Sequence, residues 1–384
     1  MIFDFKIKDN NYFFDGEVME LYKDSIPLEK SKKNILLRDD SNLEKVTFFL
    51  TEQCNAKCLY CYEQRGHKKM DIKSARKVCD YLCSNFSSVD EVSFFGGEPF
   101  LCFDVIKYIV SALNDKIIVN SYEVTTNGTL LNEEIIDFLD QNRFKVIISL
   151  DGPKYIQEKL RVGCNYEKVI SSIEQLKKKS IVDKLEINCT YTKVHKNNIT
   201  PDSLKKYFDE LKVKYTVSNV ITEKEEFKID EYKNINELKN EIDICYANLS
   251  KGCIVEKMNN YVASVIDSLV NKLYSECFCS ELEYGMAFNT DGDIFPCEKL
   301  LNQCKYGDSV LEKINKKNCT PCKDCWARGM CRKCSADIYL KNEIISENDC
   351  VDKRCYEYAL VRLVEYLEED ENVFQMIIDT FYAE

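Results

Sequence analysis

Apolar residues follow two patterns along most of the chain: short β-branched or aromatic runs, and longer stretches in which they recur with helical spacing. Between residues 46 and 229 the two patterns alternate, which is typical of an α/β fold with a parallel sheet. Six runs are predicted to be strands: Val46–Leu50, Glu91–Phe95, Ile117–Val124, Lys145–Leu150, Lys184–Tyr191 and Val213–Ile221. The helices predicted between them include Ile72–Phe86, Asn132–Gln141 and Tyr166–Lys179. Six such units fall short of the eight that close a full barrel.

The segments on either side of this region have different patterns. Residues 1–45 alternate apolar and polar positions, which predicts a small β-hairpin or meander. Residues 230–276 are charged and predict helices that bridge to a last domain. Residues 277–355 contain many cysteines and turns but little apolar periodicity. We therefore expect metal sites to provide the folding stability that a small apolar core cannot. Residues 356–384 again predict amphipathic helix.

Composition and charge narrow the choice of partner. The chain has 384 residues, 45% of them hydrophobic, which allows two or three domains of about 100–200 residues each. A formal net charge of -12 disfavours nucleic acid and anionic membranes, and it suits a basic peptide better. No apolar run approaches the roughly 20 residues of a membrane span, and Met1–Lys8 does not resemble a secretory signal. We therefore expect a cytoplasmic protein.

The 21 cysteines are the feature of the composition that bears most on function. Disulfides are rare in the cytoplasm, where thiols stay reduced, so metal or cluster ligation is the better interpretation. Three cysteines lie together between residues 54 and 61, and eleven more lie between residues 277 and 355. Free cysteine packs as a small apolar residue. We expect that role for the scattered ones: Cys79, Cys83, Cys102, Cys164, Cys189, Cys245 and Cys253.

The first group has the spacing C-x3-C-x2-C and directly follows the first predicted strand. Cys54, Cys58 and Cys61 could hold three irons of a four-iron cluster and leave the fourth iron open to a small molecule. Zinc is the competing metal, because it also prefers thiolates. A structural zinc site needs a fourth nearby ligand, and His67 is the only near candidate.

Loops after the next strands carry further candidate residues. Gly96-Gly97-Glu98-Pro99 follows the second strand, Thr125-Thr126-Asn127-Gly128 the third, and Ser149-Leu150-Asp151-Gly152 the fourth, while Asn188 lies on the fifth. In α/β units such loops gather on one face, where active sites form. Each tetrapeptide alone could be an ordinary turn. Their order at the ends of successive strands favours a shared site.

Together the cysteine triplet, Tyr60 before its last cysteine, and these loops resemble the radical S-adenosylmethionine (SAM) superfamily. The resemblance implies a partial (β/α)6 TIM barrel, a [4Fe–4S] cluster on the three cysteines, and SAM as cofactor. It also implies that the glycines let backbone approach the methionine end of SAM, with a carboxylate near its amino group. The cofactor-binding residues implied in this way are Tyr60, Gly96, Gly97, Glu98, Pro99, Thr126, Asn127, Ser149, Asp151 and Asn188.

The C-terminal cysteines resemble the SPASM extension of radical enzymes that modify peptides, which binds two auxiliary four-iron clusters. The stretch Cys322–Arg328 is most similar to maturases that install thioether bonds, of the ranthipeptide and sactipeptide type. The resemblance assigns one cluster to Cys279, Cys297 and Cys334, and the other to Cys322, Cys325, Cys331 and Cys350. Three clusters in total are therefore expected.

Several assignments stay open at this point. Cys355 competes with Cys350 as the last ligand, and Cys277, Cys304 and Cys319 compete for the fourth place on the first auxiliary cluster, unless that place is open. A zinc-ribbon-like module is the structural alternative for the paired C-x2-C motifs. No catalytic acid or base is predicted.

The function implied by the resemblance is that of a radical SAM/SPASM peptide maturase. Such an enzyme generates a 5'-deoxyadenosyl radical and forms thioether crosslinks from cysteine sulfur to carbon in a ribosomally made precursor peptide. A flavodoxin- or ferredoxin-type protein would supply electrons. Residues 1–45 would form only part of a leader-peptide-binding domain. The alternatives are an anaerobic sulfatase-maturating enzyme, which forms formylglycine, and a non-catalytic iron-sulfur or zinc scaffold.

Overall fold

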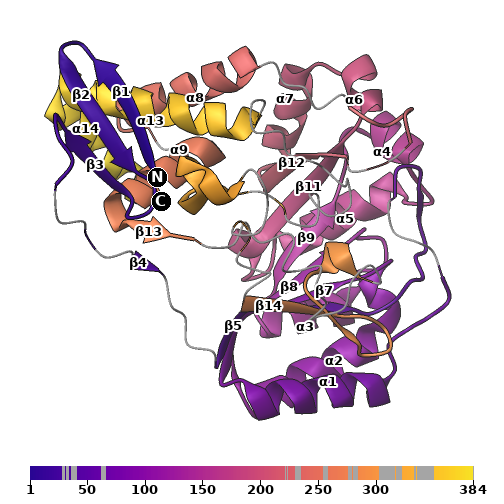
Figure 1. Ribbon diagram of the computed structural model, residues 1–384. Coiled ribbons are helices and arrows are strands. Elements are labelled where there is room, and N and C mark those ends of the chain that lie inside the picture. The colour runs from indigo at the N-terminus through magenta and orange to yellow at the C-terminus, as the bar shows by residue number, and fades with distance from the viewer. Residues whose placement is uncertain are drawn as a thin grey trace. The chain divides into compact units, whose positions relative to one another are not determined.

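The computed structural model places most of the chain in two compact units (Figure 1). The barrel unit comprises Asp39–Asp230 and Tyr284–Tyr306, and the terminal unit comprises Met1–Arg38, Glu231–Glu283 and Gly307–Glu384. The structure describes residues 1–27, 31, 34–35, 41–61, 66–220, 222, 224–229, 235–253, 258–275, 279, 284–301, 316, 322–332, 334 and 350–383.

The barrel unit contains an eight-stranded sheet with the order β12-β11-β9-β8-β7-β5-β14-β15. Its first six strands are parallel. They are β5 (Asn42–Phe49), β7 (Ser88–Phe95), β8 (Ile118–Thr126), β9 (Lys145–Ser149), β11 (Leu185–Tyr191) and β12 (Lys214–Asn219). These are the six strands expected from the sequence, with ends that differ by a few residues, and the predicted α/β fold is confirmed. Ile221, the expected end of the last strand, lies outside the described residues.

Two strands of this sheet were not expected. β14 (Gly285–Phe288) pairs parallel to β5, and β15 (Ile294–Phe295) pairs antiparallel to β14. Both come from the segment that the pattern assigned to the cysteine-rich domain. Strands of this length are too short to show a period-2 pattern, so only their pairing reveals them. The cysteine-rich segment is thus divided between the two units.

Helices connect the parallel strands. They are α1 (Ile72–Asn85), α2 (Phe103–Asn114), α3 (Glu133–Gln141), α4 (Lys154–Leu160), α5 (Tyr166–Leu176), α6 (Lys193–Asn198) and α7 (Pro201–Leu211). Side-chain caps start several of them: Asp71 accepts from the amide of Ser74, and Asn132 accepts from the amide of Ile135. These caps satisfy amides that have no partner within the helix.

The strands have one apolar face and one polar face, because successive side chains point to opposite sides. Val46 and Phe48 of β5 are buried in the core with apolar residues of α1, α2, α3 and α5. Their neighbours Lys45 and Thr47 line a cavity instead. The same alternation places Val124 in the core and Glu123 at the cavity. Helix packing therefore fixes the register that makes the inner face polar.

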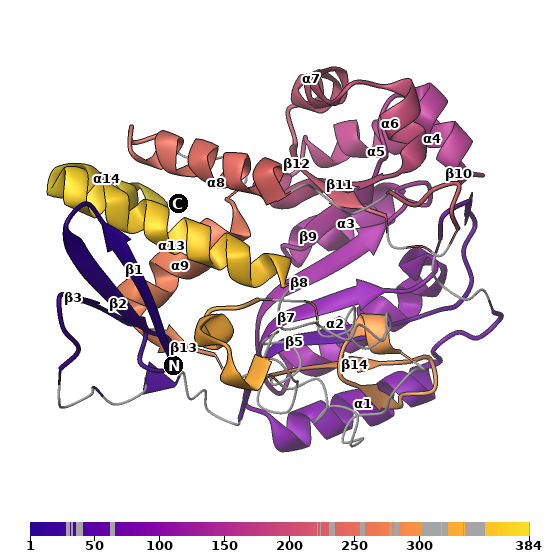
Figure 2. The same ribbon diagram turned by 45° about the horizontal axis from the view of Figure 1, so that its top comes forward.

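In its described residues the terminal unit combines a small sheet with α-helices (Figures 1 and 2). The strands β1 (Ile2–Ile7), β2 (Asn10–Asp15) and β3 (Glu20–Lys23) are antiparallel. The helices are α8 (Ile235–Leu249), α9 (Asn260–Asn271), α13 (Val351–Glu369) and α14 (Glu371–Tyr382). Trp326 stacks on Phe3 with ring centroids 4.5 Å apart, and Lys23 pairs with Glu368 at 2.8 Å. A further short pair joins β4 (Asn34–Ile35) to β13 (Leu273–Tyr274).

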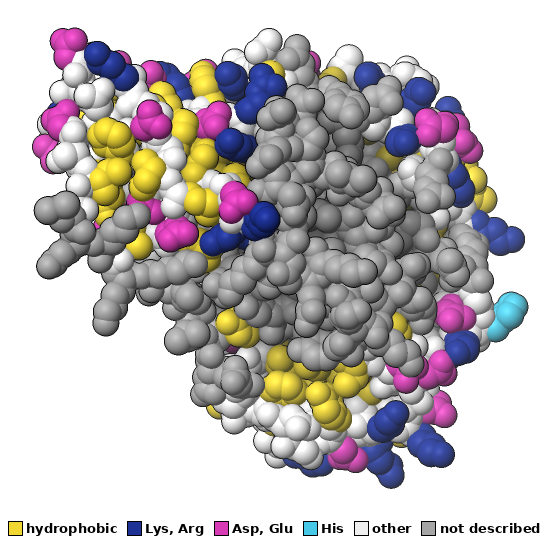
Figure 3. Space-filling view, in the orientation of Figure 1, with side chains coloured by type: hydrophobic (Ala, Val, Ile, Leu, Met, Phe, Trp, Pro, Cys, Tyr) yellow, Lys and Arg dark blue, Asp and Glu magenta, His cyan; other side chains and the backbone are white. Residues whose placement is uncertain are grey.

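Charged side chains of both signs are interspersed over the described surface of the face in Figure 3. The acidic excess of the chain is therefore not gathered into one patch on this face. A search of the described residues finds no helix with the length and apolar character needed to cross a membrane.

Candidate active site

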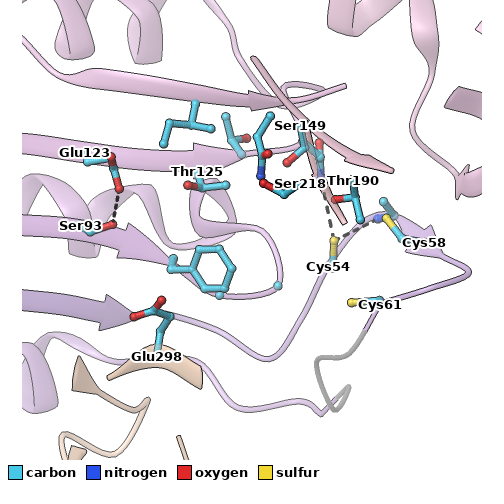
Figure 4. A pocket seen from close by; sticks show the side chains of 18 of the residues that line it. Cys54, Cys58, Cys61, Ser93, Glu123, Thr125, Ser149, Thr190, Ser218 and Glu298 are labelled. Carbon is cyan, nitrogen blue, oxygen red and sulfur yellow. Dashed lines mark hydrogen bonds between the residues drawn. The ribbon is translucent and has the colours of Figure 1, made fainter. Parts of the chain in front are cut away.

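The polar face of the parallel strands and the loop after β5 enclose a cavity of about 450 Å³ (Figure 4). All the residues that line it belong to the barrel unit. Among the expected cofactor-binding residues, those that line it are Tyr60, Gly96, Gly97, Thr126, Asn127, Ser149 and Asn188. Glu98, Pro99 and Asp151 are not among the lining residues. The structure thus brings most of the expected residues to one cavity.

The cysteine loop supplies one end of this cavity. Cys54, Cys58 and Cys61 are half-buried cysteines that all line it (Figure 4). A two-residue pairing of β6 (Lys57–Cys58) with β10 (Arg161–Val162) holds the middle of the loop. The amide of Ala56 lies 3.4 Å from the Cys54 sulfur, within hydrogen-bond range for sulfur.

The thiols fit an open cluster better than a single zinc ion. Within the described part of the chain, no three His, Cys, Asp or Glu side chains lie close enough to ligate one metal ion. His67, the expected fourth zinc ligand, is exposed, and its carbonyl oxygen accepts a hydrogen bond from Gln53 at 2.8 Å. A four-iron cluster distributes three thiolates over three irons, so it does not need them to converge on one point.

The glycine-rich loop after β7 lies directly against the cysteine loop. The amide of Gly97 donates to the Thr51 carbonyl at 2.6 Å, and the amide of Glu98 donates to the Gln53 carbonyl at 2.9 Å. A Cβ on Gly97 would lie 2.2 Å from the Gln53 oxygen, and a Cβ on Gly96 would lie 2.7 Å from the Thr51 oxygen. An added Cβ on either glycine would therefore meet the cysteine loop, and the approach of a cofactor to this backbone stays a prediction.

Glu98 is completely buried and is not among the residues that line the cavity. Its carboxylate accepts hydrogen bonds from the Thr126 hydroxyl at 2.7 Å, the Asn127 amide at 2.9 Å and the Phe100 amide at 3.3 Å. Burial raises the pKa of Glu98 to about 7, although these hydrogen bonds favour the charged form. Glu98 therefore joins the loops after β7 and β8, and the place of its carboxylate beside the cofactor stays a prediction.

A second buried carboxylate, Asp151, organises the other side of the cysteine loop. It accepts two hydrogen bonds from Arg161, at 2.9 and 3.0 Å, and one from the Tyr60 hydroxyl at 2.6 Å. Arg161 lines the cavity, and its Nη1 lies 3.9 Å from the Cys58 sulfur. Sequence reasoning missed Arg161, because only the pairing of β10 with β6 brings it to the cysteines.

Two acceptors in the cavity wall have no hydrogen-bond donor in the described part of the chain. Asn188 Oδ1 and Glu298 Oε2 are buried without a hydrogen-bond partner among the described residues, and both side chains line the cavity. An unpaired buried acceptor is costly, so such atoms point to a missing polar ligand. Glu298 begins the short 3-10 helix Glu298–Leu300, directly after Cys297, and sequence reasoning missed it as well.

Charged residues cover the wall farther from the cysteines (Figure 4). Lys45 pairs with Glu91 at 2.9 Å and with Glu123 at 3.5 Å, and Lys145 pairs with Glu123 at 2.8 Å. Burial opposes ionisation of Glu123, but the two lysines and the Ser93 hydroxyl outweigh it and lower its pKa. Period-2 alternation along the strands could have identified these residues as inward-facing.

The C-terminal cysteines are only partly described. Cys279 and Cys334 belong to the terminal unit and Cys297 to the barrel unit, and all three are half-buried. Cys277, Cys304 and Cys319 lie outside the described residues. In the terminal unit, the amide of Cys325 donates to the Cys322 carbonyl at 3.1 Å, and the amide of Cys331 donates to the Ala327 carbonyl at 2.9 Å.

The structure separates the two candidates for the last ligand. Cys350 is a half-buried residue at the N-cap of α13. Cys355 lies one turn into the helix, is fully buried in the apolar core, and has a thiol pKa that burial raises to about 11. The more accessible position of Cys350 agrees with its assignment as the last ligand, which stays a prediction.

Comparison with known proteins identifies the domain that holds the cavity. Residues 48–211 match the model of the radical SAM superfamily. The chain carries a radical SAM domain. It is an enzyme of that superfamily, and the predicted enzyme class is confirmed. The radical SAM fold binds SAM and a [4Fe–4S] cluster, and the three cavity thiols are the residues here that could hold one.

Sequence alignments with two curated relatives cover most of this radical SAM enzyme. An uncharacterised protein of Methanocaldococcus jannaschii is 29% identical over 275 residues, which are 70% of this chain and 88% of that protein. The cysteine-type anaerobic sulfatase-maturating enzyme of Clostridium perfringens is 25% identical over 356 residues, which are 81% of this chain and 94% of that protein.

Solved structures show the same fold. Native anSMEcpe with bound AdoMet and Cp18Cys peptide superposes with a TM-score of 0.60 at 21% identity, covering 86% of this chain and 99% of that one. Streptococcus suis SuiB bound to its precursor peptide SuiA gives a TM-score of 0.54 at 18% identity, covering 81% of this chain and 76% of that one.

Adding a methyl group at Gly97 should disturb the radical SAM site by displacing the cysteine loop. The Cβ of Gly97→Ala would lie 2.2 Å from the Gln53 oxygen, so the two loops must separate. We expect a loss of about 1–3 kcal/mol in the free energy of unfolding and a lower iron content after reconstitution. The control Gly252→Ala carries the cost of a positive φ, but its Cβ would lie at an ordinary 3.5 Å from Met376 Sδ. Equal iron content in both variants would contradict this role of Gly97.

Glu98 should make the stability of the radical SAM domain depend on pH. Its pKa is higher in the folded state than in the unfolded state, so its contribution is fully present below the unfolded pKa and is lost as pH rises toward about 7. Relative to Glu98→Gln, the wild type should lose roughly 3 kcal/mol of unfolding free energy over that range. Denaturant unfolding at a series of pH values measures this difference in unfolding free energy, and Glu133→Gln, at an exposed position, is the control. Parallel curves for wild type and Glu98→Gln would refute it.

Proposed function

We propose that this radical SAM enzyme is a peptide maturase that forms thioether bonds between cysteine sulfur and carbon in a ribosomally made precursor peptide. The observation that carries the proposal is the cavity, which has three half-buried thiols at one end and, in its wall, two buried acceptors without a donor among the described residues. The similarity of Cys322–Arg328 to thioether-forming maturases supports this reaction over others.

The residues at the cavity fit both cofactors. Cys54, Cys58 and Cys61 would hold the [4Fe–4S] cluster, and Asn188 Oδ1 offers an acceptor to a bound polar group. When bound, the cluster and SAM would supply radical abstraction of hydrogen from an unactivated carbon. The chain's own part is to position both groups and to exclude water. A flavodoxin- or ferredoxin-type protein would deliver the electrons.

Further cysteines would hold two auxiliary clusters. The proposed ligands are Cys279, Cys297 and Cys334 for one cluster, and Cys322, Cys325, Cys331 and Cys350 for the other. Cys277 stays a candidate for the fourth place on the first. These clusters would take up the electron released when a carbon–sulfur bond forms, or bind the substrate thiolate.

Two observations support a peptide substrate. The formal net charge of -12 suits a partner with basic residues. The solved structures that share this fold include complexes with the Cp18Cys peptide and with the precursor peptide SuiA. Nucleic acid and membranes are disfavoured as partners by the same charge.

The second candidate reaction is oxidation of one cysteine or serine of a protein to formylglycine. It is favoured by the similarity to the sulfatase-maturating enzyme of Clostridium perfringens over 94% of that protein. Both reactions can use the same cavity, so the substrate decides between them.

Mass spectrometry of the product separates the two reactions. The reconstituted enzyme is incubated with SAM, a reductant and a cysteine-rich precursor peptide encoded beside its gene. A thioether removes two hydrogens for each bond and retains sulfur, whereas formylglycine formation from cysteine removes two hydrogens and also replaces sulfur by oxygen. Cys58→Ala should abolish either product, and Cys253→Ala, which changes an exposed thiol, should not. An unchanged peptide with an active cluster would count against the thioether reaction.

Glu298 is the residue best placed to accept a proton in the cavity. Its Oε2 is buried without a partner among the described residues, and its side chain lines the cavity. Glu298→Gln should lower the rate of peptide modification about 10²- to 10⁴-fold, because it removes the base and retains the shape. The iron content should not change. Partial recovery in Glu298→Asp, and no loss in exposed Asp291→Asn, would separate proton transfer from a structural role.

A further inference from the structure

Arg161 is a buried arginine that faces a cysteine of the proposed cluster. Its side chain is 9% exposed, and its Nη1 lies 3.9 Å from the Cys58 sulfur, within hydrogen-bond range for sulfur. Its guanidinium carbon also lies 5.5 Å from the centre of the Tyr60 ring. The antiparallel pairing of Arg161 with Cys58 in β10 and β6 fixes their backbones relative to each other.

Asp151 fixes the direction of this guanidinium. Both of its carboxylate oxygens accept from Arg161, at 2.9 and 3.0 Å, in the bidentate geometry typical of strong arginine–carboxylate pairs. The amide of Thr190 donates to the same carboxylate at 3.0 Å, and the buried His195 contacts the Asp151 carbonyl oxygen at 2.7 Å. Asp151 is thus held by neighbours on two sides, and Arg161 has little freedom to move away from Cys58.

A fixed charge beside a ligand sulfur acts on the cluster's electron affinity. Reduction of a [4Fe–4S] cluster by one electron adds one negative charge, so a nearby cation and an N–H donor to sulfur stabilise the reduced form. A nearby anion has the opposite effect. Cys54 has neutral donors, the amide of Ala56 at 3.4 Å and the side-chain amide of Asn127 at 3.9 Å, whereas Cys58 has a charged one.

We propose that Arg161 and Asp151 are opposed charges that set the reduction potential of the cluster on Cys54, Cys58 and Cys61. Both are positioning residues that act through the Cys58 sulfur. The inference rests on the cluster of the proposed function, and it concerns the electron that this cluster takes from its reductant rather than the peptide reaction.

The test is an EPR-monitored redox titration with dithionite, on full-length protein reconstituted with clusters and without SAM. The variant C54A/C58A/C61A gives the signal of any auxiliary clusters, which is subtracted. Arg161→Met removes the cation and the donor, so it should lower the midpoint potential. Asp151→Asn removes the opposing anion, so it should raise the potential. Arg76→Met, an exposed arginine on α1, should leave it unchanged.

Shifts of opposite sign at normal iron content would support the inference. Unshifted potentials, or shifts of the same sign, would overturn it and leave the proposed function intact. If Arg161→Met holds no cluster, Arg161→Lys replaces it and should show a smaller shift in the same direction, because it keeps the charge and loses the bidentate fork. A wild-type protein that binds no cluster at all overturns both the inference and the proposed function.

Discussion

Close backbone contact between two loops is the constraint on which the site depends. The loop after β7 and the cysteine loop after β5 share hydrogen bonds at 2.6 and 2.9 Å, a separation that leaves no room for a Cβ at Gly96 or Gly97. Glu98 extends the connection to the loop after β8 through three hydrogen bonds. The three strand ends are thereby joined into one rigid wall, and the positions of the thiols follow from it.

A second constraint is that buried charges in the barrel unit must be paired, because a buried ion without a partner costs a large free energy of desolvation. Arg161 is matched by Asp151, and Glu123 is matched by two lysines. Because of these pairs, the cavity wall is polar, and the charges of Arg161 and Glu123 are each matched by an opposite charge. The exceptions are the acceptors of Asn188 and Glu298, and they are the atoms most open to a ligand.

The sequence by itself determined the six parallel strands, the order of the loops and the cysteine triplet. It could do so because each of these features is local. Alternation along a strand is visible within a few residues, and parallel strands must bring their C-terminal loops to the same edge of the sheet. This rule assigned Cys54 and Asn127 to one site, the family resemblance added Tyr60 and Asn188, and all four line the cavity.

Only the tertiary structure decided what those residues touch. Arg161 and Glu298 reach the cavity from segments about 100 and 240 residues after the cysteine loop, through a two-residue strand pair and a short hairpin that have no periodic signal. The complete burial of Glu98 and of Cys355 is likewise decided by contacts with distant segments. Their surroundings are set by distant parts of the chain, and a linear pattern of apolar and polar residues contains no information on which distant segments meet.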